Sequence, residues 1–261
     1  MEIAKVSIGG RGAELTAYLQ DPSSEMKTAE IKPAVLVLPG GGYFFCSDRE
    51  AEPIALAYAA EGFQAFVLRY SVGEKALGCQ PLAEAGEAIA LMRRRAAEWR
   101  IFPDKIAVCG FSAGGHLGAW VSLLGSAKPD AAVLCYPATR LGVSGEHNRV
   151  AEALLGAGYS EDADGVNLAR HVTADAPPMF AWITADDAII DARGLLEFAD
   201  AYAAAKRPYE LHIFQTGEHG LSLAKPITAG GHLAMTDARA AAWFPMSAEW
   251  LWRLFGQPET K

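Results

Sequence analysis

The chain has 261 residues, of which 51% are hydrophobic, and its mean hydropathy is +0.10. This length and composition suffice for a sizeable core, so we expect a single α/β domain over residues 1–261. The net charge of −8 and the pI of about 5.3 disfavour nucleic acid and an anionic membrane surface as partners, because both attract basic patches.

Neither a membrane span nor a secretion signal is predicted. No apolar run approaches the ~18 residues that suggest a membrane helix, and residues 1–10 lack a basic stretch followed by an apolar segment. The four cysteines contain no C-x-x-C pair, which disfavours zinc and thioredoxin-like sites. We interpret them as reduced, structural thiols and expect a cytoplasmic location, with no cofactor and no metal.

Short apolar runs alternate with helical patterns along the chain, after about 20 residues that are expected to add antiparallel strands at one edge. The predicted strands are 34–38, 64–70, 105–109, 131–136, 179–184 and 210–215. The predicted helices are 52–61, 82–99, 113–124, 192–205 and one within 237–255. This alternation predicts parallel βαβ units, hence an α/β fold with a doubly wound, mostly parallel sheet flanked by helices.

The stretch from residue 137 to residue 178 interrupts this rhythm. It is long, polar in places and weakly helical from 149 to 155. A long insertion over a sheet is often a lid or a wall of a substrate pocket. We therefore expect its charged residues, such as Glu146, Arg149 and Glu161, to border an entrance.

A G-x-S-x-G motif at residues 110–114 places Ser112 between the strand 105–109 and the helix 113–124. A tight turn at this position raises the serine hydroxyl above the sheet, where it can act as a nucleophile. The bare motif can also arise by chance in a chain of this composition. An ordinary turn with a serine cap is the alternative interpretation. The strand before it and the helix after it favour the nucleophile.

Three glycines, 40–42, follow the first buried strand. Backbone N–H groups are accessible there, as acyl transfer requires for the developing oxyanion. The residue after the nucleophile, Ala113, is expected to supply a further N–H donor. A flexible turn is the alternative interpretation of the glycines.

A serine nucleophile needs a base, and the base needs an orienting acid, in the chain order Ser, Asp or Glu, His. His219 follows the strand 210–215 between two glycines and is the predicted base. Asp187 follows the strand 179–184 and is the predicted acid, with the adjacent Asp186 as an alternative. Asp191 has the position of a helix N-cap, and His116, one turn after Ser112, is interpreted as a packing or hydrogen-bonding residue.

These motifs, together with Pro39-Gly40-Gly41-Gly42-Tyr43 and Ser47-Asp48-Arg49-Glu50, resemble the bacterial α/β hydrolases described as acetyl xylan or feruloyl esterases, close to the hormone-sensitive-lipase-like esterases. The resemblance extends from about residue 33 to residue 255. It implies an esterase with Asp187 as the acid and with oxyanion donors at Gly41, Gly42 and Ala113. Glu218 departs from the family, in which a glycine before the histidine is common.

The sequence thus predicts a serine carboxylesterase for short-acyl esters, such as acetylated sugars, that acts on a small-molecule ester without nucleic acid or membrane partners. Tyr43, Phe44 and Phe45 are expected to form walls of a small acyl pocket. A peptidase or amidase on the same scaffold is one alternative. A non-catalytic binding protein with this fold is another, although no residue of the predicted triad is missing.

Overall fold

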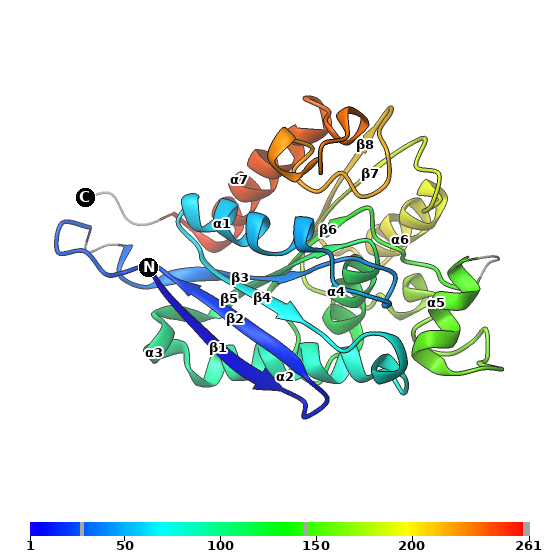
Figure 1. Ribbon diagram of the computed structural model, residues 1–261, viewed down its shortest axis with the longest axis horizontal. Helices are drawn as coiled ribbons and strands as arrows, with labels where there is room; N and C mark the ends of the chain where they lie inside the picture. The colour runs from blue at the N-terminus through cyan, green and yellow to red at the C-terminus, as the bar shows by residue number, and fades with distance from the viewer. Residues whose placement is uncertain (27–28, 143–145, 258–261) are drawn as a thin grey trace.

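The computed structural model describes residues 1–26, 29–142 and 146–257, and gives no side-chain description for residues 146–148. Its strands form an eight-stranded sheet in the order β1-β2-β4-β3-β5-β6-β7-β8 (Figure 1). The strands are β1 (Glu2–Ile8), β2 (Ala13–Leu19), β3 (Lys32–Leu38), β4 (Gln64–Arg69), β5 (Ile101–Phe111), β6 (Ala131–Cys135), β7 (Met179–Thr184) and β8 (Tyr209–Phe214). The α/β fold class predicted from the alternating pattern is therefore confirmed.

The sheet is parallel from β4 to β8, and β1 and β2 continue it as antiparallel strands at the β4 edge. Strands β6 and β7 are buried along their whole length. Their near-continuous apolar sequences are explained by helices on both faces of a parallel sheet. Because the parallel strands share one direction, the loops after β3, β5, β7 and β8 all leave the same edge of the sheet.

The helices are α1 (Glu52–Ala60), α2 (Gln80–Arg94), α3 (Ala96–Trp99), α4 (Ala113–Leu124), α5 (Glu146–Leu155), α6 (Ala192–Ala204) and α7 (Trp243–Phe255). In Figure 1, α1 and α7 lie above the sheet, whereas α2 and α4 lie below it. Tyr58 of α1 and Ser247 of α7 share a buried hydrogen bond of 2.9 Å, which joins the upper pair. Helix α4 is buried over all but its last residue, so its glycines and alanines permit close packing on β5 and β6.

The predicted helix over residues 82–99 is wrong as a continuous element. The helix breaks at Arg95, whose φ of −98° and ψ of 18° depart from helical values, and a single turn, α3, follows. This break lets the ring of Trp99 enter the core, where its centroid lies 5.1 Å from that of Phe66. Arg100 then takes a left-handed conformation, and β5 begins at Ile101, four residues before the predicted start of that strand.

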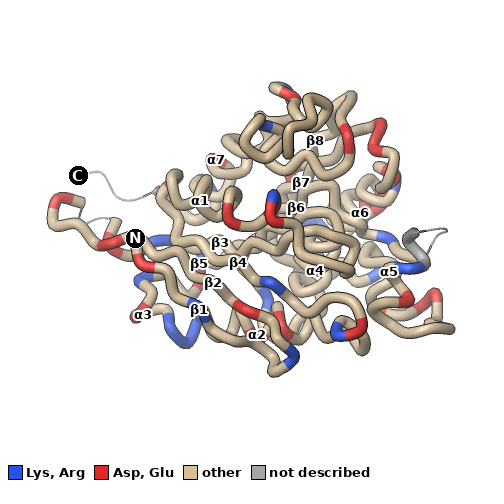
Figure 2. Tube along the Cα trace, in the orientation of Figure 1, with Lys and Arg blue, Asp and Glu red and all other residues tan. Residues whose placement is uncertain are grey.

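Charged residues of both signs are interspersed along the chain (Figure 2), and several form exposed ion pairs, such as Arg170 with Asp162 at 2.6 Å. Exposed pairs of this kind contribute little to stability. Within the described ranges, no helix combines the length and the apolar composition needed to cross a membrane.

Candidate active site

Ser112 lies at the point where β5 ends and α4 begins, and its backbone has a φ of 51° and a ψ of −114°. Few L-residues adopt this conformation. It is held by hydrogen bonds from the Ser112 N–H to the Cys135 carbonyl, 3.0 Å, and from the His116 N–H to the Ser112 carbonyl, 2.9 Å. A Cβ at Gly114 would lie 2.0 Å from the Leu38 carbonyl oxygen, so the turn requires glycine there.

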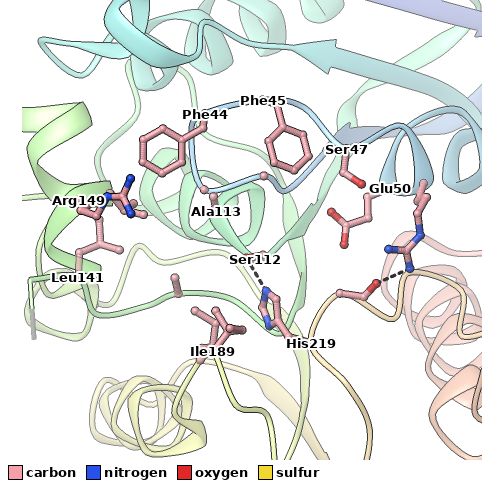
Figure 3. A pocket seen from close by; sticks show the side chains of 17 residues that line it. Phe44, Phe45, Ser47, Glu50, Ser112, Ala113, Leu141, Arg149, Ile189 and His219 are labelled. Carbon is pink, nitrogen blue, oxygen red and sulfur yellow. Dashed lines mark hydrogen bonds between the residues drawn. The ribbon is translucent and has the colours of Figure 1, made fainter. Parts of the chain in front are cut away.

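The structure brings Ser112, His219 and Asp187 into one hydrogen-bonded chain (Figure 3 shows the contact between the first two). His219 Nε2 lies 2.9 Å from Ser112 Oγ, and His219 Nδ1 lies 2.8 Å from Asp187 Oδ2. An ionised Asp187 can only accept, so the proton of the neutral imidazole belongs on Nδ1. Nε2 is then free to accept the hydroxyl proton of Ser112.

Asp187, rather than Asp186, contacts His219. The Asp187 side chain is 1% exposed, and its second oxygen, Oδ1, accepts hydrogen bonds of 2.9 Å from the N–H groups of Ile189 and Ile190. Asp186 is exposed, and its Oδ1 accepts the Gly217 N–H at 2.9 Å. The two neighbouring carboxylates thus connect the loop after β7 to two points of the loop after β8, Asp186 to Gly217 and Asp187 to His219.

The loop after β3 carries the glycines predicted to supply oxyanion donors. Gly41 and Gly42 have φ values of 126° and 62°, and both line the same pocket as Ala113. A Cβ at Gly41 would lie 2.1 Å from the Phe45 carbonyl oxygen, so no other residue fits this turn. Within the described part of the chain, the N–H groups of Gly41, Gly42 and Ala113 have no protein acceptor. They are therefore available to a bound oxygen atom.

A pocket of about 500 Å³ opens beside Ser112. Figure 3 shows Phe44 and Arg149 on one side of Ser112, and Ser47 and Glu50 on the other. The apolar lining of the pocket comes from three segments that are distant in sequence. Its side chains are Phe44, Phe45, Ala138, Leu141, Val150, Ile189 and Ile190. The pocket therefore has a mainly apolar side, where Arg149 is the charged exception, and a polar side, with the serine between them (Figure 3).

Two expectations about the pocket walls need correction. Tyr43 does not line the pocket, because its ring is fully buried and its hydroxyl is hydrogen-bonded to His116. Arg149 lines the pocket, but Glu161 is exposed elsewhere. Residues 143–145 and the side chain of Glu146 lie outside the described residues.

His116 has the packing role expected of it. Its Nδ1 lies 2.8 Å from the Tyr43 hydroxyl and its Nε2 lies 2.8 Å from the Gly165 carbonyl oxygen. Because a carbonyl only accepts, Nε2 carries the proton and Nδ1 accepts from Tyr43. Burial lowers the pKa of His116 to about 4, so the ring is neutral at physiological pH.

Two polar residues of the site, Glu50 and Tyr136, were not predicted from the sequence. Glu50 lines the pocket and is 4% exposed. Tyr136, just after β6, has a φ of 38°, and its ring lies edge-on to the imidazole of His219 with centroids 5.1 Å apart. Glu50 stood only within the motif at residues 47–50, and Tyr136 gave no signal beyond its place at a strand end. The hydrogen bond that brings them together joins residues 86 positions apart in the sequence.

Comparison with known proteins identifies the family. The BD-FAE family model matches residues 20–133. The crystal structure of MGS-M1, an alpha/beta hydrolase enzyme from a Medee basin deep-sea metagenome library, is 39% identical, superposes with a TM-score of 0.88, and the match covers 98% of this chain and 99% of that one. The chain belongs to the α/β-hydrolase family. The resemblance predicted from its motifs is therefore confirmed.

Two further relatives of this α/β hydrolase are named for their activities. The acetyl ester-xyloside bifunctional hydrolase from Caldicellulosiruptor lactoaceticus is 31% identical with a TM-score of 0.80, and the match covers 94% of this chain and 89% of that one. Endo-1,4-beta-xylanase B from Butyrivibrio fibrisolvens is 30% identical over 210 residues, which are 74% of this chain. The match covers 33% of the xylanase, so this chain spans about one third of that relative's length.

Proposed function

We propose that this α/β hydrolase is a serine carboxylesterase that hydrolyses short-acyl esters. Ser112 is the nucleophile, His219 the general base and Asp187 the orienting acid, and the N–H groups of Gly41, Gly42 and Ala113 form the oxyanion hole. The observation that carries the proposal is the hydrogen-bonded chain from Ser112 through His219 to Asp187, beside backbone donors without protein acceptors. An acyl-transfer site needs these elements together.

In the first half-reaction, Ser112 Oγ forms a bond to the ester carbonyl carbon while its proton passes to His219 Nε2. The π electrons move onto the carbonyl oxygen, and the backbone donors stabilise the resulting oxyanion. Asp187 stabilises the imidazolium through Nδ1. When the oxyanion collapses, the bond to the alcohol oxygen breaks, the alcohol leaves with the proton from His219, and an acyl-enzyme remains.

In the second half-reaction, a water molecule gives a proton to His219 Nε2 as its oxygen bonds to the acyl carbon. Collapse of this second oxyanion breaks the bond to Ser112 Oγ, which recovers the proton from His219. The carboxylic acid leaves, and the free enzyme is restored. No cofactor enters this proposed sequence, because serine, imidazole and backbone donors supply every proton and charge that it needs.

The proposed substrate is an acetyl or similarly short ester, including acetyl esters of sugars. The relative from C. lactoaceticus is an acetyl ester-xyloside bifunctional hydrolase. The polar side of the pocket, with Ser47, Arg49 and Glu50, offers groups suited to hydroxyl-rich alcohols. We also propose a cytoplasmic location, because the four cysteines are free thiols, as is usual in a reducing compartment.

The decisive experiment is Ser112→Ala, assayed with p-nitrophenyl acetate. We expect kcat to fall by about 10³-fold or more, since removal of a nucleophile leaves only the contribution of the oxyanion hole and of binding. Circular dichroism confirms that the variant is folded. A folded variant with wild-type activity would exclude Ser112 as the nucleophile. A wild-type protein that cleaves p-nitroacetanilide faster than the ester would favour an amidase.

A further inference from the structure

Glu50 is a buried carboxylate in the wall of the active-site pocket, at the end of the 3-10 helix Asp48–Glu50. A charged group is seldom buried unless hydrogen bonds or opposite charges compensate for its lost hydration. The proposed transfer of the acyl group by Ser112, His219 and Asp187 does not use it. Its position beside that reaction therefore needs a separate explanation.

The two oxygens of Glu50 are each held by a donor from a different part of the site. Oε2 accepts the N–H of Gly40, at 2.9 Å, directly before the glycines of the proposed oxyanion hole. Oε1 accepts the hydroxyl of Tyr136, at 2.5 Å. Glu50 therefore connects the loop after β3 to the residue that follows β6.

Tyr136 extends this connection to the His219 loop. Its ring lies edge-on to the imidazole of His219, at an interplanar angle of 69°, and its hydroxyl oxygen accepts the Ser222 N–H at 2.9 Å. Arg49, next to Glu50, donates to the Gly220 carbonyl at 2.8 Å. The segment from Arg49 to Glu50 thus fixes both the oxyanion loop and the loop that carries the base.

The hydrogen-bond pattern favours a negative charge on Glu50. Ser222 already donates to the Tyr136 oxygen, which leaves the Tyr136 proton to point at Glu50, and Glu50 acts as an acceptor at both oxygens. Burial is the largest influence and raises the pKa of Glu50, and the hydrogen bonds from Tyr136 and Gly40 and the charges of His219 and Arg49 offset part of this rise. The titratable groups facing this carboxylate are Tyr136, His219, Arg49, Tyr70 and Cys135.

We propose that Glu50 is a positioning residue for the proposed ester hydrolysis: it holds the Gly40–Gly42 loop and Tyr136 in register with His219, and its negative charge stabilises the imidazolium that forms on His219. Two carboxylates then stabilise the imidazolium: Asp187, hydrogen-bonded to Nδ1, and Glu50, which lines the same pocket as His219. This inference rests on the proposed function, because it assigns His219 the transfer of a proton.

The test is Glu50→Gln, which removes the charge and keeps the size and an acceptor for Gly40. We expect kcat for p-nitrophenyl acetate to fall about 10-fold with little change in KM, since imidazolium stabilisation acts in the transition state. The acid limb of the kcat/KM profile should move to lower pH by about half a unit to one unit, because loss of a nearby negative charge makes His219 harder to protonate. Asp48→Asn is the matched control: its side chain is 87% exposed in the same turn and pairs with Arg69 instead.

A loss of kcat without movement of the acid limb would reduce Glu50 to a structural role, and an unchanged kcat would overturn the proposal.

If Glu50→Gln does not fold, Tyr136→Phe tests the same connection, since it keeps the ring and removes the hydroxyl. That variant should lose kcat several-fold, and wild-type kcat would contradict the proposal. The imidazole titration of His219, followed by NMR in wild type and Glu50→Gln, requires no turnover. A titration of His219 at lower pH in Glu50→Gln than in the wild type would establish the electrostatic contact. If the wild type also cleaved no ester, the proposed function would be refuted while that contact remained established.

Discussion

Asp187 illustrates how backbone donors select one of two adjacent carboxylates. Its Oδ1 receives the N–H groups of Ile189 and Ile190, which fix the carboxylate so that Oδ2 faces His219 Nδ1. Asp186 is turned toward the Gly217 N–H on the exposed side of the loop. Only the buried carboxylate can set the tautomer of His219.

Asp187→Asn should therefore lower kcat by about 10³- to 10⁴-fold. The amide oxygen can still accept from Ile189 and Ile190, so the loop is retained, but the NH₂ group would donate to Nδ1 and force the imidazole proton onto Nε2. In that tautomer His219 cannot accept the proton of Ser112. Steady-state turnover of p-nitrophenyl acetate measures the loss.

Asp186→Asn provides the matched comparison one residue away. An asparagine oxygen can keep the contact with Gly217, and the charge lost is exposed to solvent, so kcat should stay within a few-fold of the wild-type value. If the two variants lost activity equally, the proposed role of Asp187 would be wrong.

At the scale of the elements, His116 joins three parts of the chain. It belongs to α4, accepts from Tyr43 in the loop after β3, and donates to Gly165 in the segment between β6 and β7. Tyr43 directly follows the proposed oxyanion glycines. The neutral imidazole thus supports the loop that carries them.

His116 should make the stability of the fold depend on pH. Above about pH 6.5 the ring is neutral in both the folded and the unfolded chain, and no penalty arises. As pH falls toward 4, the unfolded chain binds a proton that the buried ring resists, so the free energy of unfolding decreases by about 3 kcal/mol. Below about pH 4 this loss is complete.

His116→Gln isolates this contribution, because a glutamine amide can donate to Gly165 and accept from Tyr43 without titrating. Urea unfolding at pH 7.5 and at pH 4 should show the wild type losing about 3 kcal/mol more than the variant between those values. Parallel stability curves for the two proteins would mean that His116 does not resist protonation.

Elements with a strong local pattern were predictable from sequence. Strand 179–184 was predicted with the bounds that β7 has, and 113–124 with those of α4, because an apolar run and a glycine-bounded helix carry local signals. The break at Arg95 was missed, because the contact of Trp99 with Phe66 of β4 gives no local signal in the sequence. The burial of Glu50 likewise depends on a partner far along the chain, Tyr136. Asp187 was the predicted acid, with Asp186 as the alternative, and the donors that fix its carboxylate, Ile189 and Ile190, are local.

At the scale of the whole molecule, the pocket is assembled from distant segments with different chemistry. The whole pocket has a volume of about 500 Å³. One side has apolar walls formed by Phe44, Leu141, Val150 and Ile189, with Arg149 among them, and Ser47 and Glu50 lie on the other side (Figure 3). These walls come from the loop after β3, from the segment between β6 and β7, and from the loop after β7. A chain of a few carbons fits such walls more easily than a long one.

We therefore expect p-nitrophenyl acetate or propionate to have a kcat/KM at least about 10-fold above that of the decanoate, because added methylenes in a walled pocket cause overpacking. Measurement below the micellar limit of the longer ester avoids interfacial effects. A preference for decanoate would indicate a lipase-like enzyme. Acetylated oligosaccharides tested beside these esters examine the polar side of the pocket.

The proposed catalytic groups lie 107 residues apart between Ser112 and His219, and 32 residues apart between His219 and Asp187. Each follows a different strand, and those strands, β5, β7 and β8, belong to the same parallel part of the sheet. Such a sheet forms slowly, because a long loop must close before two parallel strands can make their contacts. Helical segments can form from local contacts well before that. Ester turnover during refolding would accordingly appear only after the central strands have paired, which makes it a late marker of the native chain.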